Sequence, residues 1–179
     1  FYIGEGETQY DELLDIYKEN KKNGGSRKEF LEKAARLSCI YVPQFYDVTY
    51  NEDGTIKEMI KNNENARDKV RKDIVLDMNE VYYPTKPLVP FIKATQDRVV
   101  LEVMRGCSRG SRFCQASQIY RPVREKSLEK LKDTARKMIE STGHEEISLS
   151  SLSTSDYSQL KGIVNFLIDE FKEKILGKN

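Results

Sequence analysis

The sequence predicts an α/β chain in two parts: a small α+β module with a β-hairpin, followed by two successive strand-helix units. The spacing of apolar residues changes from helical to alternating near Ile40. Beyond residue 95, short apolar runs alternate with amphipathic stretches of helical length. Strands that alternate with helices are typical of parallel sheets with right-handed crossovers, as in an α/β barrel or an open sheet.

Two helices are predicted in the first 40 residues. Thr8 is positioned to cap the first, whose apolar residues recur at helical spacing over 10–17. Ser26 and Glu29 have the spacing of a capping box, in which each side chain bonds a free amide of the other residue. Apolar side chains follow at helical spacing over 30–37. Neither helix carries residues typical of catalysis.

A β-hairpin follows, and then an extended segment. Tyr46–Tyr50 alternates, Asn51–Gly54 has turn residues, and Ile56–Ile60 returns as a strand. Three prolines within 83–91 restrict the residues before them to extended shapes. We therefore expect this segment to run along a surface towards a domain that begins near residue 95.

The second part consists of two strand-helix units. The first strand is Arg98–Met104, and its helix starts at Ser127 and ends at Gly143, which suits a left-handed helix end. The second strand is Ile147–Leu152, and a last helix runs from about Asp156. Two parallel strands leave exposed edges. We expect the N-terminal module, the rest of a longer chain or a second copy in a homo-oligomer to cover them.

A cysteine-containing loop follows the first of these strands. Cys107, Ser111 and Cys114 have the spacing of a CxxxCxxC iron–sulfur motif with Ser at the middle position. Three thiolates on one glycine-containing loop can hold three irons of a cubane cluster and leave the fourth iron open. A hydroxyl is a hard and poor substitute for a thiolate. Ser111 is therefore either an introduced change or a natural decay of the site.

The segment 97–127 resembles the cluster segment of radical S-adenosylmethionine (radical SAM) enzymes, in a subgroup with an upstream cobalamin-binding domain. Phe113, before the last cysteine, and the Gly4-Glu5-Gly6-Glu7 turn belong to this resemblance. It implies a partial radical SAM (βα) barrel, its first two βα units, in a piece of a longer protein. The implied domains are the end of a cobalamin-binding-like domain (1–25), a connecting module (26–95) and the N-terminal part of the barrel (96–179).

The resemblance also implies cofactors and an activity. The parent enzyme would hold a four-iron four-sulfur cluster (4Fe-4S) and S-adenosylmethionine, with cobalamin in the upstream domain. It would cleave S-adenosylmethionine reductively for radical methylation or methylthiolation. Cys107 and Cys114 would bind iron, with Ser111 at the third ligand position and Phe113 packed against the cluster. Because this chain has two of the three thiolate ligands, it would be inactive or impaired.

The residues after the second strand are rich in hydroxyl groups. By the resemblance, Ser153 and Thr154 would contact S-adenosylmethionine, although the Gly-Gly-Glu pattern common at this place is absent. Capping of the last helix by Ser155 or Asp156 is the local alternative.

The two cysteines of the loop also have simpler interpretations. They are a chance pair, or they bind zinc together with Cys39 or His144. Otherwise Cys39 is a small buried residue and His144 lies in a surface loop before the second strand. The alternative function is a non-catalytic binding module that kept its fold after losing the cluster.

Arginines surround the cysteine loop. Basic residues interleaved with Phe113 and Tyr120 are typical of surfaces that grip phosphates and stack bases, which predicts an RNA or translation-component partner. Arg121 and Arg124 are the predicted substrate-binding residues. The plainer interpretation is a solvated surface with internal ion pairs, for example Arg124 with Glu125 or Glu102. The arginines are Arg105, Arg109, Arg112, Arg121 and Arg124.

Composition constrains the possible partners and the cellular location less strongly than the motifs do. The net charge of +1 offers no global argument for a nucleic-acid or membrane partner. No apolar run approaches the roughly 18 residues that span a bilayer. Three cysteines are too few for a disulfide framework. We therefore expect a cytoplasmic protein with no membrane partner.

Overall fold

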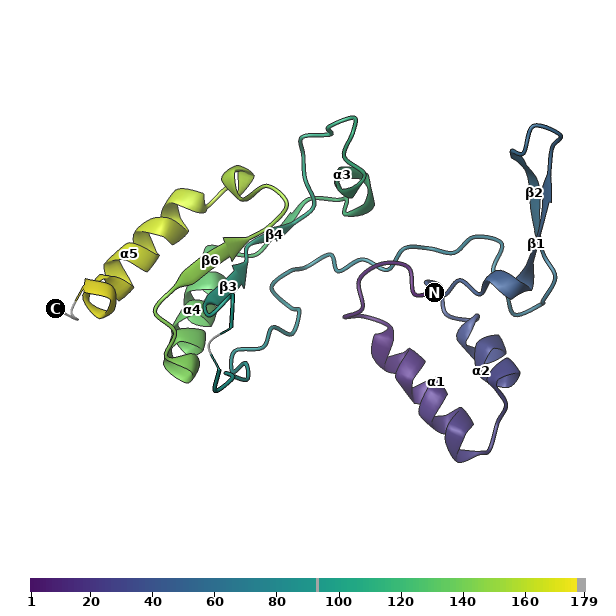
Figure 1. Cartoon of the computed structure of the whole chain (residues 1–179), viewed down its shortest axis with the longest axis horizontal. Helices are drawn as coiled ribbons and strands as arrows, with labels where there is room; N and C mark the ends of the chain where they lie inside the picture. Colours follow the sequence, from purple (N-terminus) through teal and green to yellow (C-terminus); the bar gives the residue numbers. More distant parts are fainter. Residues whose placement is uncertain (93, 177–179) are drawn as a thin grey trace. The chain divides into compact units, whose positions relative to one another are not determined.

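The computed structural model describes residues 1–92 and 94–176. The chain forms two compact units, Phe1–Val75 and Leu76–Asn179 (Figure 1). The predicted division into parts of a cobalamin-binding-like domain, a connecting module and a barrel stays a prediction.

The N-terminal unit begins with the helices α1 (Tyr10–Lys22) and α2 (Arg27–Ala34). The predicted capping box is confirmed: Glu29 N donates to Ser26 Oγ (3.2 Å), and Ser26 N donates to Glu29 Oε2 (2.6 Å). The prediction that Thr8 caps α1 is wrong. Its hydroxyl bonds the carboxylate of Asp73, and no side chain caps α1.

The predicted hairpin is confirmed. β1 (Tyr46–Tyr50) and β2 (Ile56–Lys61) pair antiparallel, with Val48 opposite Met59, after a short 3-10 turn, η1 (Pro43–Phe45). Every residue of β2 is exposed. The hairpin therefore lies outside the core of this unit.

The core of the N-terminal unit lies under α1 and α2, and Cys39 is fully buried in it. Before α1, Tyr2 bridges Ile40 and Gly4 bridges Asp73, so the first turn is an ordinary connection held by backbone bonds. Gly4 has φ +118°, and a Cβ there would overlap the backbone of Asp73. Only glycine suits this position. The buried core residues are Ala34, Ala35, Leu37, Cys39, Ile40, Val42, Phe45 and Ala66.

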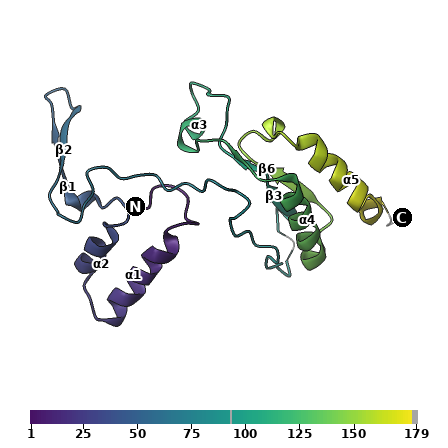
Figure 2. The same ribbon diagram turned by 180° about the vertical axis from the view of Figure 1, so that it is seen from behind.

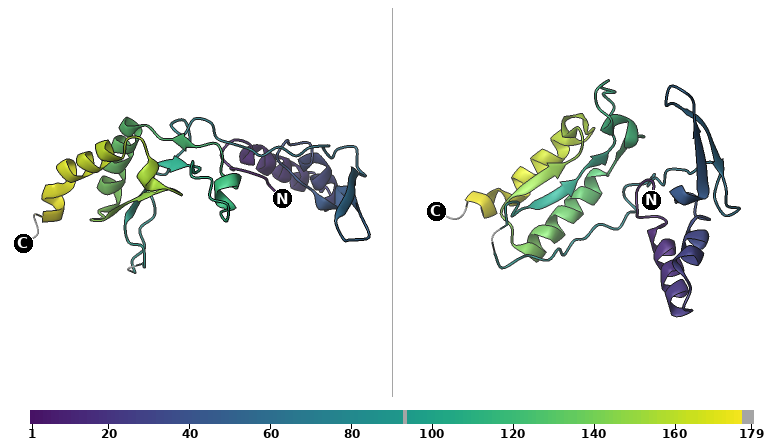
Figure 3. Two further views of the ribbon diagram at one scale, coloured as in Figure 1. Left: turned by 90° about the horizontal axis from the view of Figure 1, so that it is seen from above. Right: turned by 45° about the vertical axis from the view of Figure 1, so that its right-hand side comes forward.

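The C-terminal unit contains the predicted pair of parallel strands. β3 (Val99–Glu102) pairs with β6 (Ile147–Ser150), with Leu101 opposite Leu149 (Figure 3). Each strand is followed by a long helix, α4 (Leu128–Thr142) and α5 (Leu160–Leu176). Figure 2 shows α4 lying against the sheet. The core combines the β3 side chains Val99 and Leu101 with residues of both helices.

The ends of α4 are as predicted, and the start of α5 is not. Ser127 Oγ accepts from Lys130 N (3.3 Å), and Gly143 ends the helix with φ +71°. A 3-10 turn, η2 (Thr154–Asp156), follows β6, so α5 begins only at Leu160.

The first predicted strand is divided in two. β4 (Met104–Arg105) leaves the parallel sheet and pairs antiparallel with β5 (Arg124–Glu125). The sequence did not predict the pairing of β4 with β5, because these strands are too short to show alternation. Within the described residues, β3 and β6 have each other as their strand partners, so each keeps an unpaired edge.

Two further observations concern the segment before β3 and the character of the helices. The extended segment before β3 contacts that strand, because Tyr83 Oη donates to Val100 O (2.7 Å). Of the helices formed by the described residues, none is long and apolar enough to cross a bilayer.

Candidate functional site

Two loops meet at one end of the parallel sheet. The chain leaves β3 through β4 and enters the cysteine loop, residues 106–115, which ends in the short helix α3 (Ala116–Ile119) (Figure 1). β6 leads into a second loop, residues 151–157, which we call the serine loop. Because β3 and β6 are parallel, both loops follow the carboxyl ends of strands. In α/β barrels the active sites form at this end.

The base of the cysteine loop is fixed by a close backbone approach. Gly106 has φ +86°, and a Cβ at this position would lie 2.8 Å from both Pro122 O and Tyr120 O. β4 and β5 bring these residues to Gly106 by pairing Arg105 with Arg124. A larger residue would force the loop away from β5.

The thiols of the loop are accessible and free. Cys107 and Cys114 are half-buried and form no disulfide. Cys114 N donates to Ser111 O (3.0 Å), so positions 111 and 114 share one tight turn. Ser117, which is buried, donates its hydroxyl to Cys114 O (2.9 Å) and holds the end of this turn.

The donor set of this loop does not complete a cluster site. Two thiols and the Ser111 hydroxyl replace three thiols, and in the part of the chain that the structure describes no three His, Cys, Asp or Glu side chains form a metal-binding group. Cys39 lies in the core of the N-terminal unit. His144 lies in the loop between α4 and β6, as predicted, and its half-buried side chain places Nδ1 3.4 Å from Asp97 Oδ1.

An ion pair joins the two loops. Arg109 donates through Nε to Asp156 Oδ2 (2.7 Å) and through Nη2 to Asp156 Oδ1. Ser153 Oγ also donates to Asp156 Oδ2 (2.8 Å). The guanidinium of Arg109, followed by the Ser153 hydroxyl, lowers the pKa of Asp156. The pair holds the cysteine loop against the serine loop.

The serine loop has a different internal structure from the one predicted. Ser151 Oγ and Thr154 Oγ1 lie 2.9 Å apart, and Ser153 N donates to Ser151 Oγ (3.2 Å). The predicted capping of the last helix by Ser155 or Asp156 is wrong, because α5 starts four residues beyond Asp156. Ser153 and Thr154 lie in this loop, and their contact with S-adenosylmethionine stays a prediction.

The arginines of the loop have different surroundings. Arg124 is buried and donates to Pro122 O (2.9 Å) and Tyr120 O (3.2 Å), so it stabilises the return of the chain to β5. Arg121 is exposed and donates through Nε to Ser117 O (3.1 Å). Of the two acids predicted to pair with Arg124, Glu102 binds Arg105 (2.8 Å) and Glu125 binds Ser158.

A buried tyrosine at the end of the serine loop connects this loop to the backbone after β5. Tyr157 is 3% exposed and donates its hydroxyl to Lys126 O (2.8 Å). Burial raises the pKa of Tyr157 to about 12. Sequence reasoning did not single out Tyr157 or Lys126 and gave Asp156 a different role, since nothing in the local pattern shows which distant residue each one contacts.

Phe113 lies on the outside of the loop, with 92% of its surface exposed. Its packing against a cluster stays a prediction. Phe113 lies two residues beyond Ser111 and directly before Cys114 in the sequence.

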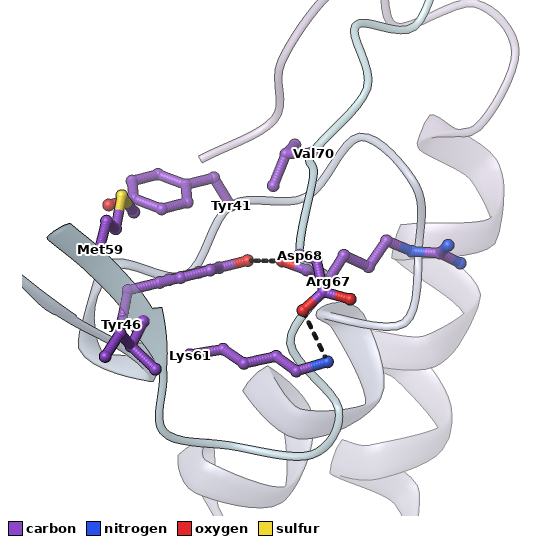
Figure 4. A pocket seen from close by; sticks show the side chains of 8 residues that line it. Tyr41, Tyr46, Met59, Lys61, Arg67, Asp68 and Val70 are labelled. Carbon is purple, nitrogen blue, oxygen red and sulfur yellow. Dashed lines mark hydrogen bonds and ion pairs between the residues drawn. The ribbon is translucent and has the colours of Figure 1, made fainter.

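A separate hollow lies in the N-terminal unit, between the hairpin and residues 67–70 (Figure 4). Its polar side chains are largely engaged. Tyr46 Oη donates to Arg67 O (2.7 Å), and Lys61 Nζ lies 3.0 Å from Asp68 Oδ1. None of the predicted site residues lines it. The lining residues are Tyr41, Tyr46, Met59, Ile60, Lys61, Arg67, Asp68 and Val70.

Comparison with known proteins adds an independent observation. Residues 1–43 match the family model described as "Radical SAM proteins, N-terminal". This match supports the radical SAM family. It covers α1 and α2 of the N-terminal unit, whereas the cysteine loop lies in the C-terminal unit, so the two observations rest on different residues.

One relative is informative about length. An uncharacterized protein of Methanocaldococcus jannaschii is 32% identical over 107 residues, which are 58% of this chain and 23% of that protein. The chain thus spans less than a quarter of the length of this relative. No solved structure matches the chain.

Proposed function

We propose that this chain is part of a radical SAM iron–sulfur enzyme of the cobalamin-dependent subgroup, and that β3 and β6 begin its barrel. The observation that carries this proposal is the position of Cys107 and Cys114. They lie on a loop at the carboxyl end of a parallel strand, joined to the serine loop by the Arg109–Asp156 pair. The family match over residues 1–43 supports it from the other unit.

In the parent enzyme, the cluster and S-adenosylmethionine would supply one-electron cleavage of a sulfonium, for radical methylation or methylthiolation of a substrate. The residues of this chain would position these groups. Cys107 and Cys114 would hold iron, and Ser153 and Thr154 would contact S-adenosylmethionine. With Ser111 in place of the third thiol, the cluster would be incomplete or labile, because ligand binding and site formation are coupled. The chain as given would therefore be inactive or impaired.

Restoring the third ligand tests the proposal. Ser111→Cys in the full-length protein, reconstituted anaerobically with iron and sulfide, should raise iron content, cluster absorbance and the paramagnetic signal of the reduced cluster. Ser108→Cys is the matched control, because it adds an exposed thiol to the same loop at the wrong spacing. If both variants bind the same amount of iron, or neither binds more than the parent sequence, the ligand assignment is wrong.

The alternative, a non-catalytic binding module, is favoured by one observation, the hydroxyl at position 111. The same experiment separates the two functions. A folded Ser111→Cys protein that gains no cluster would favour the module.

The unpaired edges of β3 and β6 support a proposal about partners. We expect the rest of a longer chain or a second copy to cover them. Size-exclusion chromatography with light scattering should show oligomers for the isolated chain, and a monodisperse, fully folded monomer would contradict the proposal. Three free thiols support the expected cytoplasmic location, where thiols stay reduced.

A further inference from the structure

The β-hairpin of the N-terminal unit has two open edges. Within the described residues β1 and β2 pair only with each other, so the outer edge of each strand presents amide and carbonyl groups without a strand partner. The hairpin projects away from α1 and α2 (Figure 1), and every residue of β2 is exposed. A two-stranded hairpin is marginally stable in water without a further strand or a helix packed on it. A strand from another molecule would supply this support.

The edge of β2 has features that protect it against such pairing. Three of its residues in the sequence IKEMIK are charged, and two of these are lysines. The register with β1 shifts between Thr49 and Tyr50, which leaves Lys57 as the extra residue of a bulge. Charged side chains, above all lysine, and bulges are the features that keep edge strands from pairing with other chains.

The edge of β1 has neither feature. Its sequence, YDVTY, consists of residues that favour strands, with Asp47 as its single charge. Tyr50 leaves 62% of its surface exposed at the end of the strand. Of the two edges, that of β1 is therefore the one suited to pairing.

The sequence of β1 is also complementary to itself. When two copies of a strand pair antiparallel about a two-fold axis, one residue faces its own copy. The register that overlaps β1 most fully is centred on Val48. It places Tyr46 opposite Tyr50 of the second copy and Asp47 opposite its Thr49, so no like charges meet and two aromatic pairs form.

The same operation on β2 brings like charges together. Two registers overlap this strand most fully. One is centred on Glu58 and sets two carboxylates opposite each other. The other is centred on Met59 and sets Lys57 opposite Lys61 of the second copy. Like charges directly opposite destabilise a sheet. Charge complementarity thus selects β1 as the strand that meets its own copy.

We propose that β1 pairs antiparallel with β1 of a second copy of this chain, with Val48 on the two-fold axis. The two hairpins then form one four-stranded sheet in the order β2-β1-β1-β2. Pairing satisfies the open edge of β1 and covers the exposed ring of Tyr50 with Tyr46 of the second copy. The interface belongs to the N-terminal unit and needs neither the cluster nor the barrel, so it goes beyond the proposed function.

Position 49 allows a test in which reversing a charge reverses the effect. Thr49→Lys places a lysine opposite Asp47 of the second copy twice in each dimer, and Thr49→Asp places a carboxylate there. The lysine variant should dimerise about fivefold more tightly than the parent chain and the aspartate variant about fivefold more weakly. Sedimentation equilibrium at several protein concentrations measures both constants. Added salt should bring the two variants together, because it screens exposed charges.

Lys57→Glu is the matched control, because it reverses a charge on the exposed strand β2, whose edge the dimer does not use. It should leave the dissociation constant unchanged. Thr49 also faces Glu58 across the hairpin, so a second measurement uses the parent chain alone. Amide hydrogen exchange over residues 46–50 should slow as the protein concentration rises through the dissociation constant.

Three results would overturn the dimer proposal. The chain could stay monomeric up to about 1 mM. An oligomer could form that responds to neither Thr49 variant, which would mean that it forms through another edge, such as that of β3 or β6. Lys57→Glu could shift dimerisation as much as the Thr49 variants do. None of these results depends on iron, so failure of this proposal is distinguishable from failure of the Ser111→Cys experiment.

Discussion

Each unit of the protein ties distant segments together through one aspartate, and the two aspartates differ in their surroundings. Asp73 of the N-terminal unit is 7% exposed and binds the hydroxyls of Tyr2 and Thr8. Asp156 of the C-terminal unit is bound by the guanidinium of Arg109, which is 64% exposed. The first network closes a core, whereas the second joins two surface loops. The comparison predicts that loss of the Asp73 network lowers the stability of the chain, whereas loss of the Arg109–Asp156 pair affects the two loops more than the core.

The largest expected effect comes from the segment that packs on Asp73. Gly4→Ala should destabilise the chain by roughly 3 kcal/mol, because the new Cβ overlaps the Asp73 backbone and φ is positive. Gly24→Ala, with positive φ but open space around it, should lose only about 1 kcal/mol. Urea unfolding followed by circular dichroism measures both. Equal losses would show that the turn does not depend on its approach to Asp73.

The next effect concerns Asp73 itself. Asp73→Asn should destabilise the chain by about 1–3 kcal/mol, because a buried acceptor of two hydroxyl hydrogen bonds is weakened. Asp133→Asn is the control. It breaks an exposed pair with Lys137 (2.7 Å) on α4 and should change stability by no more than about 0.5 kcal/mol. If the two variants unfold at the same urea concentration, burial of Asp73 is not what distinguishes it.

A smaller effect, dependent on pH, is expected under the serine loop. The folded pKa of Tyr157, about 12, lies above the ordinary value of 10.0, so the protein favours the protonated phenol. Its contribution to stability is complete below pH 10 and is lost as the pH rises towards 12. Tyr157→Phe should remove this pH dependence and, by deleting the bond to Lys126 O, cost about 1 kcal/mol at neutral pH.

The titration of Tyr157 is measurable in the ultraviolet absorbance of tyrosinate. The difference between the parent protein and Tyr157→Phe should have its midpoint near pH 12. Tyr82→Phe serves as the control, since Tyr82 is 85% exposed. A Tyr157 midpoint at the ordinary tyrosine value of 10.0 would contradict the burial of the phenol.

Local chemistry predicted much of the fold and the place of the cysteine loop after β3. The Ser26–Glu29 capping box, the hairpin and the ends of α4 at Ser127 and Gly143 depend on residues a few positions apart, and the structure has all of them. The parallel pairing of β3 and β6 followed from the order of elements.

Long-range partners could not be predicted in the same way. Asp156 has the appearance of a helix cap in the sequence, yet it binds Arg109, 47 residues away. Thr8 likewise does not cap α1, and its hydroxyl donates to Asp73, 65 residues away. A local pattern shows that such a side chain is polar and near a turn. Which distant group it meets depends on where the strands and loops bring the chain, and many candidates of suitable charge compete.

The smallest effect on stability, and the most direct probe of the site, comes from the Arg109–Asp156 pair. Asp156→Asn should change the free energy of unfolding by no more than about 1 kcal/mol, because Arg109 is mostly exposed and solvent screens the pair. It should nevertheless loosen the cysteine loop, which has no other described contact of this strength with the serine loop. Amide hydrogen exchange over residues 107–114 should become faster.

Glu170→Gln is the matched control for this last comparison, because it removes the partner of another bidentate arginine, Arg136 (2.8 and 3.2 Å), between α4 and α5. Exchange over 107–114 should not respond to it. If both variants speed exchange in the loop equally, the pair acts only through general stability. If Asp156→Asn alone does so, the ion pair orders the segment that carries Cys107 and Cys114.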